Sequence, residues 1–226
     1  MIDTKNRISI QVGLSGYSFK IQAEGNSHSS EWLSAERIFN TSEFMKRYDQ
    51  VDVSVFTPKF ALVPTNFYAP EVSRQMLEEV ANVEDGDNVD HVEVPQFGAV
   101  LVYSLNVGGT LAKVVSETVM QTDGTKGRML PEVYYMMDAM SEISDYNKIV
   151  ASYMDGCLYL AIAQGKTLIL CNSFQAPDFT TAEYFIFLVM KKLQLNPEIS
   201  SIYFRTSLSE DQEMSLYRYF RSVEHI

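Results

Sequence analysis

The chain has few of the residues that most often carry enzyme chemistry. Its 226 residues include two cysteines, three histidines and one tryptophan. No CxxC pair occurs, and no His or Cys cluster has the spacing of metal ligands, which argues against zinc and dithiol redox sites. Cys157 and Cys171 lie in apolar strand-like runs, where buried free thiols are expected. The histidines are far apart in the sequence, so we expect no metal site: His28, His91 and His225.

Phosphate-binding and hydrolase motifs are also missing. Neither GxxxxGK[ST] nor GxGxxG occurs, and the Gly-Gly of residues 107–110 is predicted to form a tight turn. No GxSxG is present, and no histidine closely follows a candidate nucleophile. The acidic stretch 82–90 resembles a calcium loop only superficially, because Gly86 is not followed by a correctly placed Glu. We therefore predict a solvated loop there.

The sequence lacks long apolar runs and an excess of positive charge. Near a predicted helix the longest apolar run is 184–190, far below the roughly 20 residues that span a bilayer. The N-terminus has no apolar signal-peptide core, so we expect a cytoplasmic protein without membrane insertion. The formal net charge of -11 repels phosphate backbones, which disfavours nucleic-acid binding. Solubility explains this acidity, and an acidic face that attracts a basic partner is the alternative.

Alternation of apolar and polar residues predicts a β-hairpin at the start of the chain. Residues 7–12 alternate, Gly13 and Gly16 bracket a turn, and the alternation resumes over 17–21. This period of two is typical of strands that bury one face.

The middle of the chain is predicted to contain short strands and helices. A third strand is expected within 31–39, and Asn40 with Glu43 forms a cap-like pattern at the head of a helix over 44–48. Pro70 suits the first turn of an amphipathic helix. The other expected elements are strands over 51–56, 60–64 and 98–105, a loop over 121–128, and a helix from Pro131 to Ser144 with a Met-rich core face.

The C-terminal part gives the clearest pattern. Capping boxes at 180–183 and 209–212 begin two helices, and the first helix is apolar nearly all round, which predicts deep packing. The expected strands are 149–153, 157–163, 167–171 and 199–204. The order is therefore β-β-β-α-β-α.

That order is similar to the ribonuclease H-like unit, and its duplication resembles the actin-like ATPase superfamily. The two hairpins, one in 7–21 and one in 148–163, suggest an internal duplication. The resemblance implies an α/β fold of two ribonuclease H-like (actin-like) βββαβα lobes, with mixed sheets flanked by helices. We expect an N-terminal lobe over 1–120, a loop and linking helix over 121–147, and a C-terminal lobe over 148–226.

The resemblance also shows which phosphate-binding features have degenerated. Gln11 stands where the superfamily carries a metal-directing aspartate, Asp155 lies at a turn, and 204–208 lacks the Gly-Gly of the adenosine loop. Phosphoryl transfer is therefore not expected, and neither is two-metal nuclease chemistry, because the opening strands hold no interior carboxylate. What remains are weak candidates for a cofactor-binding site: Gly13, Ser15, Gly16, Ser18, Asp155 and Gly156.

More closely, the chain resembles a bacterial family of unknown function with this duplicated fold. The resemblance covers nearly the whole chain and rests on short motifs: Ile8-Ser9-Ile10, Gly16-Tyr17-Ser18-Phe19, Asn172-Ser173-Phe174 and Glu183-Tyr184-Phe185. It implies no established activity.

These observations favour a pseudo-ATPase: a non-catalytic cytoplasmic scaffold or adaptor that binds a protein partner. Some bacterial secretion and pilus assembly proteins use the actin-like fold in this way. The alternative is a nucleotide-binding protein or weak ATPase that uses the cleft between lobes, although bound ATP and Mg²⁺ are disfavoured. The 13 tyrosines and 13 phenylalanines suit an interface, or fill the core. Exposure of four tyrosines would favour the interface: Tyr134, Tyr135, Tyr217 and Tyr219.

Overall fold

The computed structural model describes residues 6–23, 25–106 and 109–226. The chain divides into two compact units, each treated by itself below. Unit 1 comprises residues 1–60, 74–90 and 103–132, and unit 2 comprises residues 61–73, 91–102 and 133–226. The predicted lobe boundaries at 120 and 148 stay a prediction. The turn predicted at 107–110 lies partly outside the described residues.

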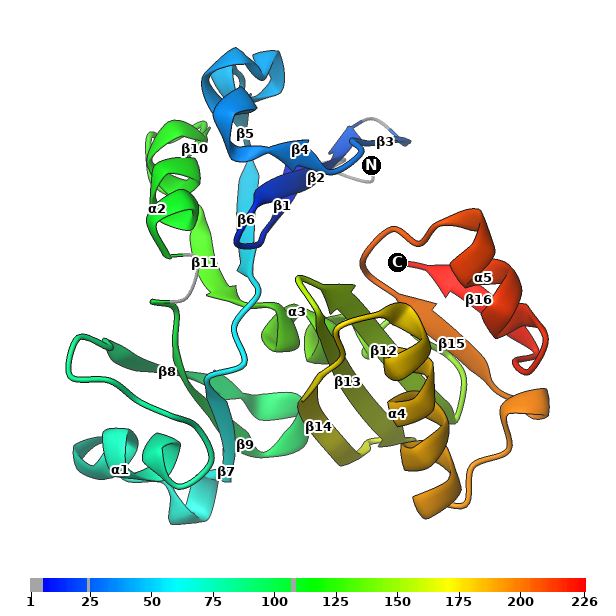
Figure 1. Cartoon of the computed structure of the whole chain (residues 1–226). Helices are drawn as coiled ribbons and strands as arrows, with labels where there is room; N and C mark the ends of the chain where they lie inside the picture. The colour runs from blue at the N-terminus through cyan, green and yellow to red at the C-terminus, as the bar shows by residue number, and fades with distance from the viewer. Residues whose placement is uncertain (1–5, 24, 107–108) are drawn as a thin grey trace. The chain divides into compact units, whose positions relative to one another are not determined.

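Unit 1 is built on a mixed, six-stranded sheet (Figure 1). Its strands are β1 (Arg7–Val12), β2 (Gly16–Ala23), β3 (Asn26–Ser29), β4 (Leu33–Ser34), β6 (Gln50–Val55) and β11 (Arg128–Pro131). The order is β11-β6-β1-β2-β3, with β4 also on β2. Strands β1 and β2 are antiparallel, which confirms the predicted hairpin. Strands β6 and β11 run parallel to β1, so the carboxyl ends of β1, β6 and β11 lie at one edge.

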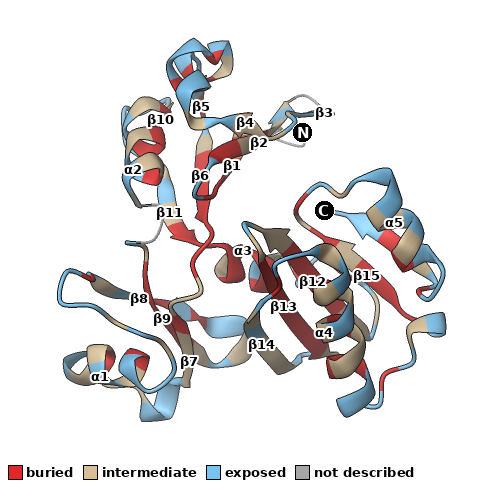
Figure 2. Cartoon of the chain, viewed as in Figure 1, coloured by how far each residue is buried: buried red, intermediate tan, exposed pale blue. Residues whose placement is uncertain are grey.

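Burial explains the two kinds of strand in this sheet (Figure 2). In β1 every second residue is buried, as its alternating sequence predicts. In β6 all residues after Gln50 are buried, as expected of a strand between two parallel neighbours with both faces covered. Helix α2 (Gly109–Thr118) contributes Ala112 and Val115 to the same core.

One local prediction in unit 1 is confirmed only in part, and another is wrong. The strand expected within 31–39 is limited to β4, and a 3₁₀-helix, η1 (Ala35–Asn40), follows it, buries Ile38 and accepts a hydrogen bond from the Thr41 hydroxyl at the Arg37 carbonyl. Instead of a helix over 44–48, the 3₁₀-helix η2 (Ser42–Met45) leads into β5 (Arg47–Tyr48), which pairs in parallel with β10 (Met120–Gln121). Tyr48 is buried and its hydroxyl donates to the Glu43 carbonyl, which favours the short strand over another helical turn.

A three-stranded sheet in the order β7-β9-β8 occupies the middle of the sequence. Its strands are β7 (Phe60–Pro64), β8 (Val89–Val94) and β9 (Ala99–Ser104), and the boundaries of the two units fall within them. The predicted strands over 60–64 and 98–105 are confirmed. The predicted helix begins with a 3₁₀ turn, η4 (Pro70–Val72), and continues as α1 (Ser73–Glu78). The other short helices here are η3 (Thr65–Phe67) and η5 (Pro95–Phe97).

Unit 2 contains a five-stranded sheet in the order β14-β13-β12-β15-β16. Its strands are β12 (Asn147–Met154), β13 (Cys157–Gln164), β14 (Thr167–Gln175), β15 (Ser201–Phe204) and β16 (Ser222–His225). Its other elements are α4 (Phe179–Lys192), η6 (Pro197–Ile199) and α5 (Glu210–Tyr217). The predicted β-β-β-α-β-α order is confirmed, and β16 extends it by a strand that the sequence patterns did not reveal. Helix α3 (Glu132–Ala139) starts after Pro131, which belongs to β11 and not to the helix.

The helix starts in unit 2 follow local capping chemistry. Ser209 and Gln212 form the reciprocal capping box predicted for α5. The box predicted at 180–183 is wrong, because the Asp178 carboxylate caps α4 two residues earlier and accepts from the Thr181 amide at 2.7 Å. An aspartate satisfies the amides of the first turn and also suits the positive end of the helix dipole.

The two main sheets share one connectivity. In each, an antiparallel hairpin (β1–β2, β12–β13) is followed by a later strand parallel to the first (β6, β15). The predicted mixed α/β fold is thus confirmed, while duplication of the sequence stays a prediction. In the described part of the chain, no helix is both long and apolar enough to cross a bilayer.

Candidate functional site

The first candidate region is the turn between β1 and β2 in unit 1. The Gly13 amide donates to the Gly16 carbonyl at 3.0 Å, and the Ser15 carbonyl accepts from the Ala35 amide at 3.3 Å. A Cβ atom on Gly16 would lie 2.0 Å from the Leu33 carbonyl oxygen. Glycine is therefore needed here for the close approach of β4. The turn is held by its own backbone.

A polar network lies beside this turn, at the carboxyl ends of the parallel strands. The Gln11 side-chain amide donates to Glu132 Oε1 at 3.0 Å, and the Ser54 hydroxyl donates to the other carboxylate oxygen. On the other side of Gln11, the Ser18 hydroxyl donates to Gln11 Oε1 at 3.5 Å. Gln11 and Ser54 are register partners on β1 and β6, and Glu132 directly follows β11. Ligands of α/β proteins bind at such strand ends, so this is where a phosphate site is expected.

The electrostatics of this network do not suit a phosphate. The Glu132 residue is 1% exposed, and its carboxylate adds a negative charge where phosphate oxygens would lie. As the first residue of α3, Glu132 is stabilised by the positive end of the helix dipole. In the described part of the chain, no group of three or more His, Cys, Asp or Glu could hold a metal ion that would offset this charge.

Sequence reasoning missed Glu132. It was included in a helix that was expected to begin at Pro131, so its position at the edge of the sheet was hidden. The sequence carried no local signal for it, because β11 is recognised only through its pairing with β6.

The second candidate region, Asp155-Gly156, is the two-residue turn between β12 and β13 in unit 2. The φ angles of Asp155 and Gly156 are 50° and 69°, and Met154 pairs with Cys157 to close the hairpin. Asp-Gly is the preferred pair for such a turn. The Gly156 carbonyl accepts from the Ala176 amide at 2.8 Å. Asp155 and Gly156 thus form the turn that closes the β12–β13 hairpin. Their grouping with Gly13, Ser15, Gly16 and Ser18 of unit 1 into one site stays a prediction.

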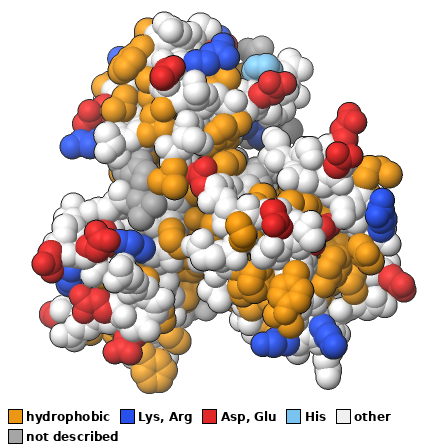
Figure 3. Space-filling view, viewed as in Figure 1, with side chains coloured by type: hydrophobic (Ala, Val, Ile, Leu, Met, Phe, Trp, Pro, Cys, Tyr) orange, Lys and Arg blue, Asp and Glu red, His pale blue; other side chains and the backbone are white. Residues whose placement is uncertain are grey.

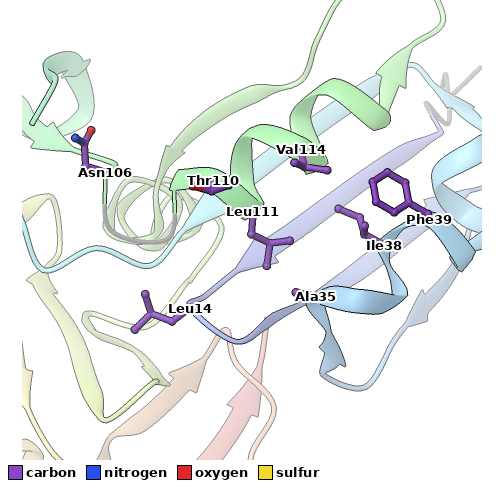
Figure 4. Close-up of a pocket in the computed structure, with 8 residues that line it drawn as sticks. All are labelled: Leu14, Ala35, Ile38, Phe39, Asn106, Thr110, Leu111 and Val114. Carbon is purple, nitrogen blue, oxygen red and sulfur yellow. The ribbon is translucent and has the colours of Figure 1, made fainter. Parts of the chain in front are cut away.

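An apolar groove in unit 1 provides a different kind of candidate site (Figure 4). It has a volume of about 390 Å³ and lies between η1 and α2, beside the β1–β2 turn. Two of its side chains are largely exposed, Leu14 at 60% and Phe39 at 68%. The lining residues are Leu14, Ala35, Ile38, Phe39, Asn106, Thr110, Leu111 and Val114.

The acidic loop before β8 is anchored by a buried ion pair. Lys59 Nζ lies 2.6 Å from Asp87 Oδ2, and the Ser104 hydroxyl donates to Asp87 Oδ1 at 3.2 Å. The hydrogen bond from the Lys59 ammonium lowers the pKa of Asp87 below its ordinary value. The stretch predicted to be a solvated loop is largely exposed, and the buried Asp87 is an exception. A lysine occupies the position where a calcium ion would have to bind this carboxylate.

The same loop is bonded to one end of the groove. The Asn106 side-chain amide donates to the Gly86 carbonyl at 2.5 Å, and its oxygen accepts from the Asn88 amide at 3.3 Å. Arg74 donates to the backbone carbonyls of Glu84 and Asp87 from the side of α1. Asn106 therefore connects the apolar groove to a strongly acidic segment.

The four tyrosines considered for an interface differ in exposure. Tyr217 and Tyr219 are about half exposed, Tyr134 is half-buried, and Tyr135 is buried beneath the Arg205 guanidinium. The Tyr219 ring packs on Phe187 at 4.8 Å between ring centroids. Only two of the four tyrosines are exposed, so the four do not by themselves define an interface.

Comparison with solved structures identifies the fold. A Bacteroides thetaiotaomicron protein with an actin-like ATPase fold and unknown function aligns with a TM-score of 0.70 and 16% identity, over 100% of this chain and 94% of that chain. A chain of the PilM–PilN type IV pilus biogenesis complex aligns with a TM-score of 0.54 and 12% identity, over 97% and 88%. At these identities the likeness shows the fold alone. The expected actin-like fold is confirmed.

No curated protein matches the chain significantly. The predicted resemblance to a family of unknown function with an actin-like fold is confirmed. The model of the family described as protein of unknown function (DUF3822) matches residues 2–223, and the chain therefore belongs to that family.

Proposed function

We propose that the chain is a non-catalytic cytoplasmic scaffold or adaptor, which binds a protein partner and does not turn over nucleotide. The observation that carries this proposal is the network of Gln11, Ser54 and Glu132 at the carboxyl edge of the unit 1 sheet. These side chains, which would have to face a metal-bound phosphate, are hydrogen-bonded to one another instead.

Phosphoryl transfer requires positive charge and free amides around the phosphates. The amide of Gln11 is neutral and donates to Glu132, so it cannot direct a metal ion as a carboxylate does. The Gly13 amide is bonded within its own turn. A nucleotide would have to break these contacts and accept a buried carboxylate beside its phosphates.

Protein binding by a similar fold supports the positive part of the proposal. The PilM–PilN structure is a complex of two different proteins, and one of its chains shares this fold over most of its length. The exposed apolar groove of unit 1 offers surface that a protein partner can bury.

The first test is thermal unfolding of the purified chain with millimolar Mg-ATP or Mg-ADP. Saturation to 100 times the dissociation constant would stabilise the native state by ~2.7 kcal/mol, which raises Tm by several degrees. We expect no shift. A reproducible shift would overturn the proposal in favour of a nucleotide-binding protein or weak ATPase.

The second test addresses the partner. The tagged chain, produced at its natural level in its own host, should elute from size exclusion in a stoichiometric complex with a different protein. Elution only as a monomer or homo-oligomer, in growth conditions where the protein is made, would contradict a scaffold.

A further inference from the structure

We propose that the apolar groove of unit 1 binds a short amphipathic segment of a protein partner. Two or three apolar side chains of that segment enter the groove, and Lys or Arg residues next to them lie over the acidic loop 84–90. This inference rests on the proposed scaffold function and specifies the chemistry of the partner.

The groove has the properties of an anchoring site. Its volume of about 390 Å³ lies within the roughly 300–1,000 Å³ typical of pockets that enclose small ligands. Leu14 and Phe39 expose more than half of their surface, and Leu111 and Val114 are half-buried on α2. Covering apolar surface contributes roughly 25 cal/mol per Å², so each of these side chains favours an occupant.

The acidic loop supplies the charge that complements a basic segment. Residues 74–90 contain a single basic residue, Arg74, and the carboxylates of Glu78, Glu79, Glu84, Asp85, Asp87 and Asp90. Lys59 neutralises the buried Asp87, whereas Glu79, Glu84 and Asp85 are exposed. Figure 3 shows acidic side chains, together with some Lys and Arg, on the part of the surface near β8, and hydrophobic side chains near α2.

Asn106 sets the direction of the segment. In Figure 4 Asn106 lies at one end of the lining residues and Phe39 at the other. Because Asn106 is hydrogen-bonded to Gly86 and Asn88, the acidic loop adjoins that end. The apolar residues should therefore lie between η1 and α2, with the basic residues at the Asn106 end. The same charge disfavours nucleic acid and a second copy of this chain, whose net charge is also -11.

The test is selection of a random 12-residue peptide library, displayed on phage, against the purified full chain. The enriched peptides are then labelled and their affinities measured by fluorescence anisotropy. We expect sequences with two or three apolar residues next to Lys or Arg, and binding that weakens several-fold between 50 and 300 mM salt.

Matched variants locate the binding site. Phe39→Ser should weaken peptide binding by about tenfold or more, as expected for an aromatic anchor. Met45→Ser changes a side chain of η2 that is 72% exposed and does not line the groove, and it should leave the affinity unchanged. Combined Asp85→Asn and Glu84→Gln should weaken binding by about threefold to tenfold and reduce its salt dependence. Glu142→Gln, an exposed acid of unit 2, is the control.

Several results would overturn the proposal: no enriched peptide, peptides without a basic end, or equal affinity for wild type and Phe39→Ser. Dimerisation of the chain that Phe39→Ser abolishes would assign the groove to a second copy and would also overturn it. If Phe39→Ser retains the partner in the co-elution assay, the groove assignment fails and the scaffold stands. A thermal shift induced by nucleotide would contradict both the scaffold function and the groove assignment that rests on it.

Discussion

Replacing Gln11 with Glu tests whether the polar network of unit 1 excludes a second negative charge. The substitution keeps the length of the side chain and places a carboxylate oxygen where the amide nitrogen lies, 3.0 Å from Glu132 Oε1. Two unit charges about 4 Å apart repel by roughly 4 kcal/mol at an effective dielectric constant of 20. The pair can avoid this repulsion by binding a proton.

Proton uptake limits the cost. As the pH falls toward the raised pKa of the introduced carboxyl, the pair binds a proton and the cost decreases, since each unit of pKa shift is worth about 1.36 kcal/mol. Because Gln11 is half-buried and solvent screens part of the interaction, we expect Gln11→Glu to destabilise the chain by about 2–3 kcal/mol at pH 8. For a chain of this size, that corresponds to a decrease in Tm of about 4–12 °C.

The stability lost in Gln11→Glu should depend on pH in a direction that follows from the raised pKa. A carboxyl whose folded-state pKa is raised binds its proton more tightly in the folded state, so the variant recovers stability as the pH falls toward 5. Urea unfolding of wild type and variant at pH 5 and pH 8 measures the difference directly. Gln22→Glu, on the exposed part of β2, is the control with the same change in charge and should show little effect. Equal stability of Gln11→Glu and wild type at pH 8, or a loss that does not shrink at pH 5, would refute the reasoning.

Three further predictions concern the structure around the candidate sites. Asp87→Asn should destabilise the chain by about 2–4 kcal/mol at pH 7, because it leaves the Lys59 ammonium buried without its counter-ion. Since the pKa of Asp87 is lowered, urea unfolding should show that this difference shrinks only as the pH falls below the ordinary aspartate range and through the lowered pKa. Gly16→Ala should lower Tm by at least several degrees because its Cβ would meet the Leu33 carbonyl, whereas Gly86→Ala, with open space around it, should change Tm little. Ser209→Ala removes the α5 capping box and should cost about 1 kcal/mol in urea unfolding.

The sequence predicted elements well where one local pattern decided the structure. Both opening hairpins, the β-β-β-α-β-α succession of elements in unit 2 and the capping box at Ser209 follow from alternation, turn residues and capping chemistry. Predictions failed where distant contacts decided. Tyr48 joins a two-residue strand because its partner lies at Gln121, and no local pattern reveals that pairing. Strand β16 is recognised only through its pairing with β15.

The candidate site was predictable only in part. The sequence identified Gln11 as a departure from the actin-like pattern, and the structure provides the reason that this departure is stable. Its partner Glu132 lies 121 positions away, so no spacing rule connects the two. The burial of Asp87 could not be predicted for the same reason. An aspartate in an acidic stretch is expected to be solvated, and only the structure shows that Lys59 lies beside it.

The two candidate regions of unit 1 differ in what an occupant would gain. At the edge of the sheet, Gln11, Ser54 and Glu132 already satisfy one another, so a ligand must replace hydrogen bonds that are made in its absence. In the groove, the Leu14 and Phe39 side chains are largely exposed, and any occupant that covers them gains apolar burial. On the proposed function, the edge of the sheet no longer provides the driving force for ligand binding. That driving force lies at the groove, and a partner that supplies apolar and basic side chains together uses both the groove and the acidic loop beside it.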